Sequence, residues 1–333
     1  MLAIYPLPMA DPQVPDAAPP ASATVMLASG QTASLAGLSG ADLHQLQWEQ
    51  EQKFARAITA FPAGSPERQL IVGQAYDTIS ALLAQQAAVE SPGPNDADDS
   101  DSPLLMGFHQ KYVRLVLRLL EAQVARGEGR PRMFEVGYGS GVLLKEVRDY
   151  GFEVGGIEVS AAMRERAVRV LGDRYAGGLL VGDFRALAAE DLPGAPTLVY
   201  WNDVLEHVAV DEAADYLAHI HTLLAPRGQL VTITPNWLMR PSDVTGDFCP
   251  PRTEARGLHL KEYRLAEVTR LLRRAGFRRV ATPLVTTRRR VWLCGGGGRI
   301  AKQLLEPVLD RAPVKLARLL CRGLAMSCTI ATK

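Results

Sequence analysis

The chain has 333 residues, and 47% of them are hydrophobic, which is ample for one large domain with a sizeable core and an appendage. Its 37 basic and 36 acidic residues give a formal net charge of +1, so no overall charge excess points to nucleic acid or to an anionic membrane. The four cysteines lie far apart without a C-x-x-C pair, which argues against a zinc site or a disulfide framework and predicts a reducing, cytoplasmic location.

The first hundred residues change composition twice. Residues 1–40 are rich in Pro, Ala, Ser and Gly without periodicity, which predicts a disordered tail and no signal peptide. Residues 41–60 and 66–90 carry apolar side chains at helical spacing, and the stretch SPGPNDADDSDSP at 91–103 predicts an acidic linker. The expected parts are therefore a tail at 1–40, a helical extension with its acidic linker at 41–104, and a main domain at 105–333.

From residue 105 onward, apolar strands alternate with amphipathic helices, and no run of 18 apolar residues predicts a transmembrane helix. This alternation predicts an α/β fold with seven strands in a mostly parallel sheet that helices cover on both faces. The strands are expected near 132–137, 153–158, 178–182, 197–202, 229–234, 278–285 and 326–332. We expect Asp211 to cap the helix at 211–224, and ligands to bind at the carboxyl ends of the strands.

The stretch MFEVGYGSGVLLKEV, residues 133–147, runs from a strand through three glycines into a helix. Such a turn lets backbone N–H groups approach a ligand closely, although it is also compatible with an ordinary tight connection. The spacing is G-x-G-x-G, with Val142 where a dinucleotide-binding fingerprint has its third glycine. This spacing argues against an NAD-dependent oxidoreductase.

The next two strands also end in residues that suit a nucleoside. Glu158 lies at the tip of the run VGGIE, where its carboxylate could accept hydrogen bonds from ribose hydroxyls or simply be solvated. The following strand ends in Gly182, Asp183 and Phe184, so an acceptor for an exocyclic amine stands beside an apolar face for a purine. On its own, this second motif is also a common turn.

Taken together, these motifs resemble the class I S-adenosylmethionine-dependent methyltransferases over residues 105–333. FEVGYGSG, GIEVS and GDF stand in the order of that family's glycine, ribose and adenine motifs. NDVLEHV at 202–208 and RGQLVTITPN at 227–236 are similar to the fourth and fifth motifs of the subgroup that includes the quinone-biosynthesis O-methyltransferases. HLKEYRLAEVTRLLRRAGF at 259–277 is similar to the segment that follows there. The resemblance implies a Rossmann-like methyltransferase domain with S-adenosyl-L-methionine as cofactor.

The resemblance also implies roles for individual residues. The methionine part of the cofactor would lie against the glycine turn, its ribose and adenine at the next two strands, and its methyl group at the fourth. The implied cofactor-binding residues are Glu135, Gly137, Tyr138, Gly139, Gly141, Glu158, Val159, Asp183, Phe184, Asn202 and Asp203. Tyr138 replaces a smaller residue of the family pattern and is expected to narrow the pocket.

Transfer to a hydroxyl requires a proton acceptor, and histidine is well matched to that task near neutral pH. His207, in LEHV, and His259, before the late helix, are the candidate catalytic residues, although His207 could also only pack or cap a turn. The other histidines, His44, His109, His219 and His221, fall in predicted helices and are expected to be structural or exposed. We assign no metal ligands, although Asp203, Asp243 and Asp247 could in principle meet.

The acceptor is expected to be a small molecule, methylated at a hydroxyl oxygen. The fourth strand lacks the Asn/Asp-Pro-Pro-aromatic motif of base methylation, which makes a nucleic acid an unlikely partner. The loop at 237–261 is long enough for a lid, and its arginines (Arg240, Arg252 and Arg256) suggest a carboxylate, phosphate or phenolate on the acceptor. The alternatives are a methyltransferase acting on RNA or protein, and a non-catalytic binding protein of the same fold.

Two basic features near the C-terminus remain. Residues 313–326 place Lys315, Arg318 and Arg322 opposite a row of leucines, so this helix could pack on the sheet or make a peripheral membrane contact. Arg288 to Arg290 precede the run VWLCGGGGRI, and we expect its glycines, 295–298, to form a flexible turn. The oligomeric state does not follow from the sequence.

Overall fold

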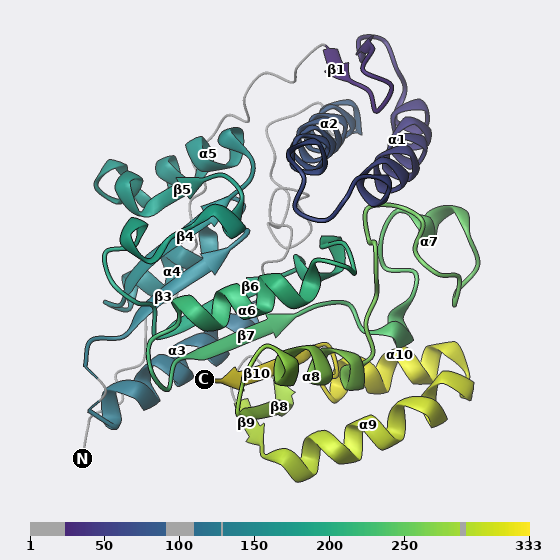
Figure 1. Ribbon diagram of the computed structural model, residues 1–333. Coiled ribbons are helices and arrows are strands. Elements are labelled where there is room, and N and C mark those ends of the chain that lie inside the picture. The colour runs from purple at the N-terminus through teal and green to yellow at the C-terminus, as the bar shows by residue number, and fades with distance from the viewer. Residues whose placement is uncertain (1–23, 91–109, 128, 287–290) are drawn as a thin grey trace.

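The computed structural model describes residues 24–90, 110–127, 129–286 and 291–333 (Figure 1). The predicted acidic linker, His109 and the run Arg288 to Arg290 therefore lie outside the described residues. In the described part of the chain, no helix combines the length and the apolar character needed to cross a membrane.

A mixed, mostly parallel sheet forms the centre of the molecule, as predicted, with the strand order β5-β4-β3-β6-β7-β10-β8-β9. Its strands are β3 (Arg132–Val136), β4 (Glu153–Glu158), β5 (Leu179–Val181), β6 (Leu198–Asn202), β7 (Gln229–Ile233), β8 (Arg279–Thr286), β9 (Val291–Cys294) and β10 (Cys328–Thr332). The first five strands in this order pair in parallel, whereas β10 is antiparallel to both β7 and β8.

The sheet has eight strands where seven were predicted. The additional strand is β9, which pairs antiparallel with β8 at the edge of the sheet. It is only four residues long and runs directly into glycines, so its apolar letters had not been counted as a strand. An edge strand needs a partner on one side only, which lets so short a segment join the sheet.

Helices cover both faces of the sheet because its central strands alternate their side chains between two apolar clusters (Figure 1). In β6, Leu198 and Tyr200 face the cluster on the side of α3, α4 and α5, whereas Val199 and Trp201 face the cluster on the side of α6 and α8. The helices are α3 (Gln110–Ala125), α4 (Val142–Asp149), α5 (Ala161–Leu171), α6 (Ala213–Leu223) and α8 (Leu265–Arg274). The carboxyl ends of β3, β4, β5 and β6 consequently open at one edge.

The N-terminal extension has a hydrophobic core of its own. A hairpin of β1 (Thr24–Met26) and β2 (Thr32–Ser34) packs with two long helices, α1 (Gly40–Ala60) and α2 (Pro66–Glu90). The prediction of a disordered tail up to residue 40 is therefore wrong for residues 24–40. Val25 and Leu35 are buried against α1 and α2, which gives these short strands the apolar contact that their composition did not suggest.

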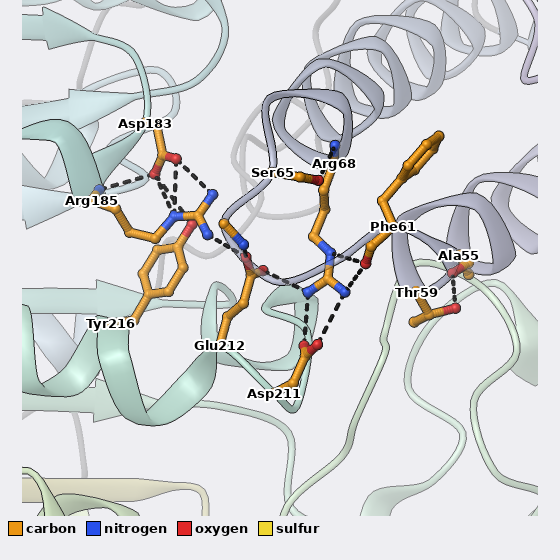
Figure 2. Close-up of polar contacts among 11 residues, drawn as sticks. Ala55, Thr59, Phe61, Ser65, Arg68, Asp183, Arg185, Asp211, Glu212 and Tyr216 are labelled. Carbon is orange, nitrogen blue, oxygen red and sulfur yellow. Dashed lines mark hydrogen bonds and ion pairs between the residues drawn. The ribbon is translucent and has the colours of Figure 1, made fainter.

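A buried arginine joins this extension to the main domain (Figure 2). The Arg68 side chain is 2% exposed, and its Nη1 lies 2.7 Å from Asp211 Oδ1 and 3.2 Å from Glu212 Oε2. Its Nε donates to the carbonyl oxygen of Phe61 at 3.0 Å. Asp211 was predicted to cap the following helix, but α6 begins at Ala213 without a side-chain cap, because the Asp211 carboxylate binds Arg68 instead.

Between β8 and β10 the chain inserts β9 and two helices, α9 (Gly296–Arg311) and α10 (Val314–Gly323). The glycines at 295–298 were expected to form a flexible turn, but Gly295 caps α9 and the next three glycines belong to its first turn. Glycine lowers helix propensity, so packing farther along the helix, where Leu309 is buried beside α10, must hold the helix in place.

The Arg68 contact gives a testable prediction. Arg68→Ala would leave the Glu212 carboxylate, itself 5% exposed, with one cationic partner fewer, and should lower the free energy of unfolding by about 3 kcal/mol. Urea denaturation measures this loss. Arg56→Ala, at an exposed site on α1, is the matched control and should change stability by less than about 0.5 kcal/mol. Equal effects of the two substitutions would contradict the role given to Arg68.

Candidate functional site

The glycine turn after β3 adopts a left-handed backbone at each of its three glycines, with φ of 72° at Gly137, 50° at Gly139 and 75° at Gly141. A Cβ on Gly137 would lie 2.8 Å from Val204 Cγ2, and a Cβ on Gly141 would lie 2.6 Å from Leu171 Cδ1. A Cβ on Gly139 would meet nothing within 4 Å. Packing therefore requires glycine at the first and third positions, whereas the middle one borders open space.

Glu158 lies over this turn, as its position at the tip of β4 predicted. Its Oε2 accepts a hydrogen bond from the backbone N–H of Gly139 at 2.9 Å, and its Oε1 accepts one from Val159 at 2.8 Å. Burial raises the pKa of Glu158, although these backbone donors oppose the shift. Ser160 N–H makes a third, longer contact to Oε1 at 3.4 Å, and a carboxylate has about four lone-pair positions, so about one hydroxyl donor could still bind there.

Glu135 is a buried carboxyl group behind the same turn. Its side chain is 6% exposed, and its Oε2 has no hydrogen-bond partner. Burial, together with the nearby charge of Glu158, raises the pKa of Glu135 well above its ordinary value. A buried acceptor without a donor is costly, so this position suits a ligand that brings a positively charged donor.

Two aromatic residues of the predicted site point into the core. The Tyr138 ring is buried, and its hydroxyl donates to the carbonyl oxygen of Leu180 at 3.0 Å, so the expectation that this ring narrows a pocket is wrong. Phe184 is also buried and lies edge-on to His219, with 5.0 Å between the ring centroids. Only the backbone of these two residues lies at the carboxyl ends of the strands, because their rings are buried in the core.

Asp183, at the end of β5, is held by the arginine two residues later. Arg185 donates to its carboxylate from Nε at 2.9 Å and from Nη2 at 2.7 Å, and Tyr216 Oη lies 3.4 Å away (Figure 2). Arg185 also forms an ion pair with Glu212, which is the residue that binds Arg68 of α2. The predicted adenine-binding residue is thus part of the network that attaches the N-terminal extension.

The end of β6 carries a strained residue. Asp203 has a φ of 52°, which is unfavourable for any residue other than glycine. Its backbone N–H donates to the carbonyl oxygen of Ile233 at 3.1 Å, and its Oδ2 accepts from Asn202 Nδ2 at 3.1 Å. Such strain in a loop at the carboxyl edge of the sheet is typical of functional sites.

The two predicted catalytic histidines meet beyond β6, with 4.8 Å between their ring centroids. His207 Nδ1 lies 3.0 Å from the carbonyl oxygen of Leu258. A carbonyl can only accept, so Nδ1 carries the proton and Nε2 keeps its lone pair. Burial, followed by the charge of His259, lowers the pKa of His207 to about 3, so the ring is neutral.

His259 has the opposite electrostatics. Its Nδ1 lies 3.5 Å from Glu262 Oε1. Burial would lower the pKa of His259, but the carboxylate of Glu262, followed by the charge of Glu206, raises it to about 9. His259 therefore carries a positive charge near neutral pH. A neutral and a charged imidazole stand side by side.

Glu206 is a member of this cluster that the sequence reasoning did not select, although it precedes His207 in LEHV. Its side chain is fully buried, and neither carboxylate oxygen has a hydrogen-bond partner. Burial, followed by the charge of Asp203, raises the pKa of Glu206 to about 8. The motif LEHV could have pointed to Glu206 as a site residue, but only the fold shows that its carboxyl group is buried among the histidines.

Helices α1 and α2 also reach the histidine cluster, which no motif indicated. The Tyr76 ring of α2 lies edge-on to His207, with 5.8 Å between the centroids. Glu51 Oε2 of α1 accepts from the backbone N–H of Leu258 at 3.1 Å. The N-terminal extension therefore covers the side of the site that lies beyond β6.

The same cluster is the place where the described residues could hold a metal ion. Glu206, His207 and His259 each offer an atom for a ligand set whose members all lie within 4.8 Å of one another. Two imidazoles and a carboxylate suit zinc and similar divalent ions. Asp243 and Asp247, the acids considered from the sequence, bind elsewhere, to the N–H of Gly257 and to His44.

The long loop after β7 contains a short helix, α7 (Thr245–Phe248), and its arginines are used largely for packing. Arg240 lies over the Trp237 ring, 3.9 Å from its centroid, and pairs with Asp310 of α9 at 3.0 Å. Arg252 donates to the carbonyl oxygen of Ala312. Two of the three arginines that were expected to bind the acceptor thus contact the C-terminal insertion of α9 and α10 instead.

Comparisons with known proteins found a matching family model and similar solved structures. A family model described as a methyltransferase domain matches residues 108–282. The structure is similar to a magnesium protoporphyrin IX methyltransferase from Synechocystis PCC 6803 bound to S-adenosylhomocysteine, at 21% identity and a TM-score of 0.46, over 67% of this chain and 95% of that one. It is also similar to an S-adenosylmethionine-dependent methyltransferase from Archaeoglobus fulgidus, at 17% identity and a TM-score of 0.41, over 66% and 94%. A search of curated proteins gave no match.

The glycine turn yields a prediction about stability. Gly141→Ala would place a methyl group against Leu171 and Ala167 on α5, whereas Gly139→Ala would meet open space and incur only the left-handed backbone cost, about 1 kcal/mol. Gly141→Ala should therefore be the more destabilising of the two by about 2 kcal/mol. Urea denaturation of both variants tests this order, and equal losses would contradict it.

Proposed function

Since the chain belongs to the methyltransferase-domain family, whose model matches more than half of it, we propose that it transfers a methyl group from S-adenosylmethionine to a hydroxyl oxygen of a small molecule. The observation that carries this proposal is the neutral His207, whose Nδ1–H is fixed by the Leu258 carbonyl and whose Nε2 can accept a proton. It stands beyond the fourth strand, on the side of the site away from the glycine turn.

The residues at the strand ends fit S-adenosylmethionine. When bound, this cofactor supplies a methyl carbon activated by a sulfonium charge. Gly139 leaves open space where its Cβ would be, the unpartnered Glu135 carboxyl group suits an ammonium group, and Glu158 suits the ribose hydroxyls. Gly137, Val159, Asn202 and Asp203 border this space in our proposal, and Asp183 would bind the adenine amine in exchange for one of its contacts to Arg185 or Tyr216.

On the acceptor side of the site, the two histidines have different roles. Because the pKa of His207 is only about 3, its Nε2 removes the hydroxyl proton only where the adjacent positive charge of His259 makes the hydroxyl more acidic, and the Nδ1–H bond to Leu258 keeps the ring in the tautomer that can accept it. His259, held positive by Glu262, stabilises the negative charge that develops on the oxygen. The Glu206 carboxyl group lies in the same cluster, and because its pKa is raised to about 8 it can take the proton onward only above that pH, where it is ionised.

The cover over this cluster supports a small acceptor. Tyr76 of α2 packs against His207, and Glu51 of α1 holds the peptide of Leu258, so parts of this chain occupy the approach that a folded RNA or protein acceptor would need. The net charge of +1 adds no attraction for nucleic acid. The resemblance of NDVLEHV to the quinone-biosynthesis O-methyltransferases makes phenolic and catecholic hydroxyls the acceptors to test first.

The cofactor assignment predicts a specific calorimetric result. The protein should bind S-adenosylmethionine but not NAD, and Glu158→Ala should weaken that binding at least tenfold, or by about 1.4 kcal/mol, because the ribose hydroxyls lose their acceptor. Glu153→Ala, at the other end of β4, is the matched control and should bind normally. No binding of S-adenosylmethionine by the parent chain would end the enzyme proposal and favour a non-catalytic binding protein.

The base assignment predicts the effect of His207→Asn. An asparagine amide can still donate to the Leu258 carbonyl but cannot accept the proton, so kcat should fall about 100-fold or more while S-adenosylmethionine binding stays unchanged. Formation of S-adenosylhomocysteine with a panel of phenols, RNA and protein acceptors provides the measurement. His221→Asn, on the far turn of α6, is the control and should keep full activity.

Chelation separates this role from a metal-bound one. A proton-accepting cluster keeps its activity after treatment with a chelator. Loss of activity that zinc or manganese restores would instead assign Glu206, His207 and His259 to a metal ion that binds the acceptor oxygen. Activity on RNA or protein alone would replace the small-molecule proposal.

A further inference from the structure

The C-terminal insertion exposes an unusual number of large apolar side chains. Figure 1 shows α9 and α10 along one edge of the molecule, beyond β8 and β9. Leu304 is 71% exposed, Leu319 is 67% exposed and Val308 is 62% exposed. The other exposed apolar side chains of this region are Leu284, Trp292, Leu293, Ile300 and Leu316. We call this set the apolar face.

The apolar face is separate from the core that holds the insertion in place. On α9, Ile300, Leu304 and Val308 recur every fourth residue and form one outward stripe. The buried positions of the same helix, Lys302, Glu306 and Leu309, lie on its opposite side. On α10 the buried residues are Ala317 and Cys321, whereas Leu316 and Leu319 point outward. The fold is therefore complete without the apolar face.

The charges around the apolar face are positive. Lys315 and Arg322 are exposed and stand four residues before and three residues after Leu319, so they flank it on α10. Arg311 is exposed at the end of α9. The acidic side chains of these helices, Glu306 and Asp310, point toward the rest of the protein and away from the apolar face. Glu306 accepts from Asn236, and Asp310 pairs with the arginines of the neighbouring loop.

We propose that this apolar face binds an anionic membrane surface, with the insertion lying in the plane of the headgroups. Apolar side chains in the acyl boundary and cations at the phosphates are what such a surface requires, and an exposed tryptophan, Trp292, suits the same depth. A second copy of the chain fits less well. A twofold contact would bring the positive charges of both copies, Lys315 and Arg322 from each, into one interface.

This inference is independent of the proposed reaction, and it gives the basic amphipathic segment at 313–326 a role together with α9. The buried face of α10 packs against α9 and Leu238 rather than on the sheet, and its opposite face remains available for contact with a membrane. An anionic leaflet supplies a negative potential that attracts each cation near its surface.

Vesicle sedimentation tests the proposal. The full chain should sediment with vesicles of phosphatidylcholine and phosphatidylglycerol in about equal parts but not with phosphatidylcholine alone, and high salt should weaken this binding. Leu304→Glu combined with Leu319→Glu should reduce it at least tenfold, as should Lys315→Glu combined with Arg322→Glu. Leu70→Glu, at a 63% exposed leucine on α2, is the control for charge added elsewhere.

Two results would overturn the proposal. One is failure of the parent chain to sediment with anionic vesicles, or sedimentation that both double variants retain. The other is light scattering that shows a dimer which Leu304→Glu dissociates, since the face would then contact a second copy. S-adenosylmethionine binding and the urea midpoint of each variant, measured alongside, separate a lost contact from an unfolded protein.

Discussion

The carboxylate of Glu212 is the point on which the arrangement of this molecule depends. It is buried and binds two arginines that come from different parts of the chain, Arg68 from α2 and Arg185 from the loop after β5. It also accepts from the backbone N–H of Gly64, in the connection between α1 and α2. One side chain thus fixes the N-terminal extension to the edge of the sheet where the glycine turn and Asp183 lie. The contact places Tyr76 and Glu51 over the histidine cluster, so the architecture of the acceptor side follows from it.

Much of the main domain could be predicted because its strands are buried on both faces. Runs such as Leu198 to Trp201 are apolar throughout and end in glycine or polar residues, which gives a clear pattern. The hairpin before α1 could not be predicted in this way. Its strands have three residues each, and the contacts that stabilise them come from helices that follow later in the chain. The strand β9 was not predicted either, because it is only four residues long and, among the described strands, pairs with β8 alone.

The residues of the candidate site also differ in whether the sequence could predict them. Glycines and carboxyl groups at strand ends could be predicted, because the sequence itself indicates both the left-handed backbone and the position at the end of a strand. Glu158 over Gly139 is such a case. Partners that meet across long separations carry no such signal. The burial of Glu206 and the approach of Tyr76 depend on how the elements pack, and the inward turn of the Tyr138 ring depends on the Leu180 carbonyl of β5.

Leu258 couples the cover of the site to its chemistry. Its N–H donates to Glu51 of α1, its carbonyl accepts from His207, and its side chain is part of the apolar cluster of the extension. A single residue is therefore held on both sides by hydrogen bonds. Any shift of α1 away from Leu258 would also loosen the anchor that orients the His207 ring, so the position of the cover and the orientation of the imidazole depend on each other.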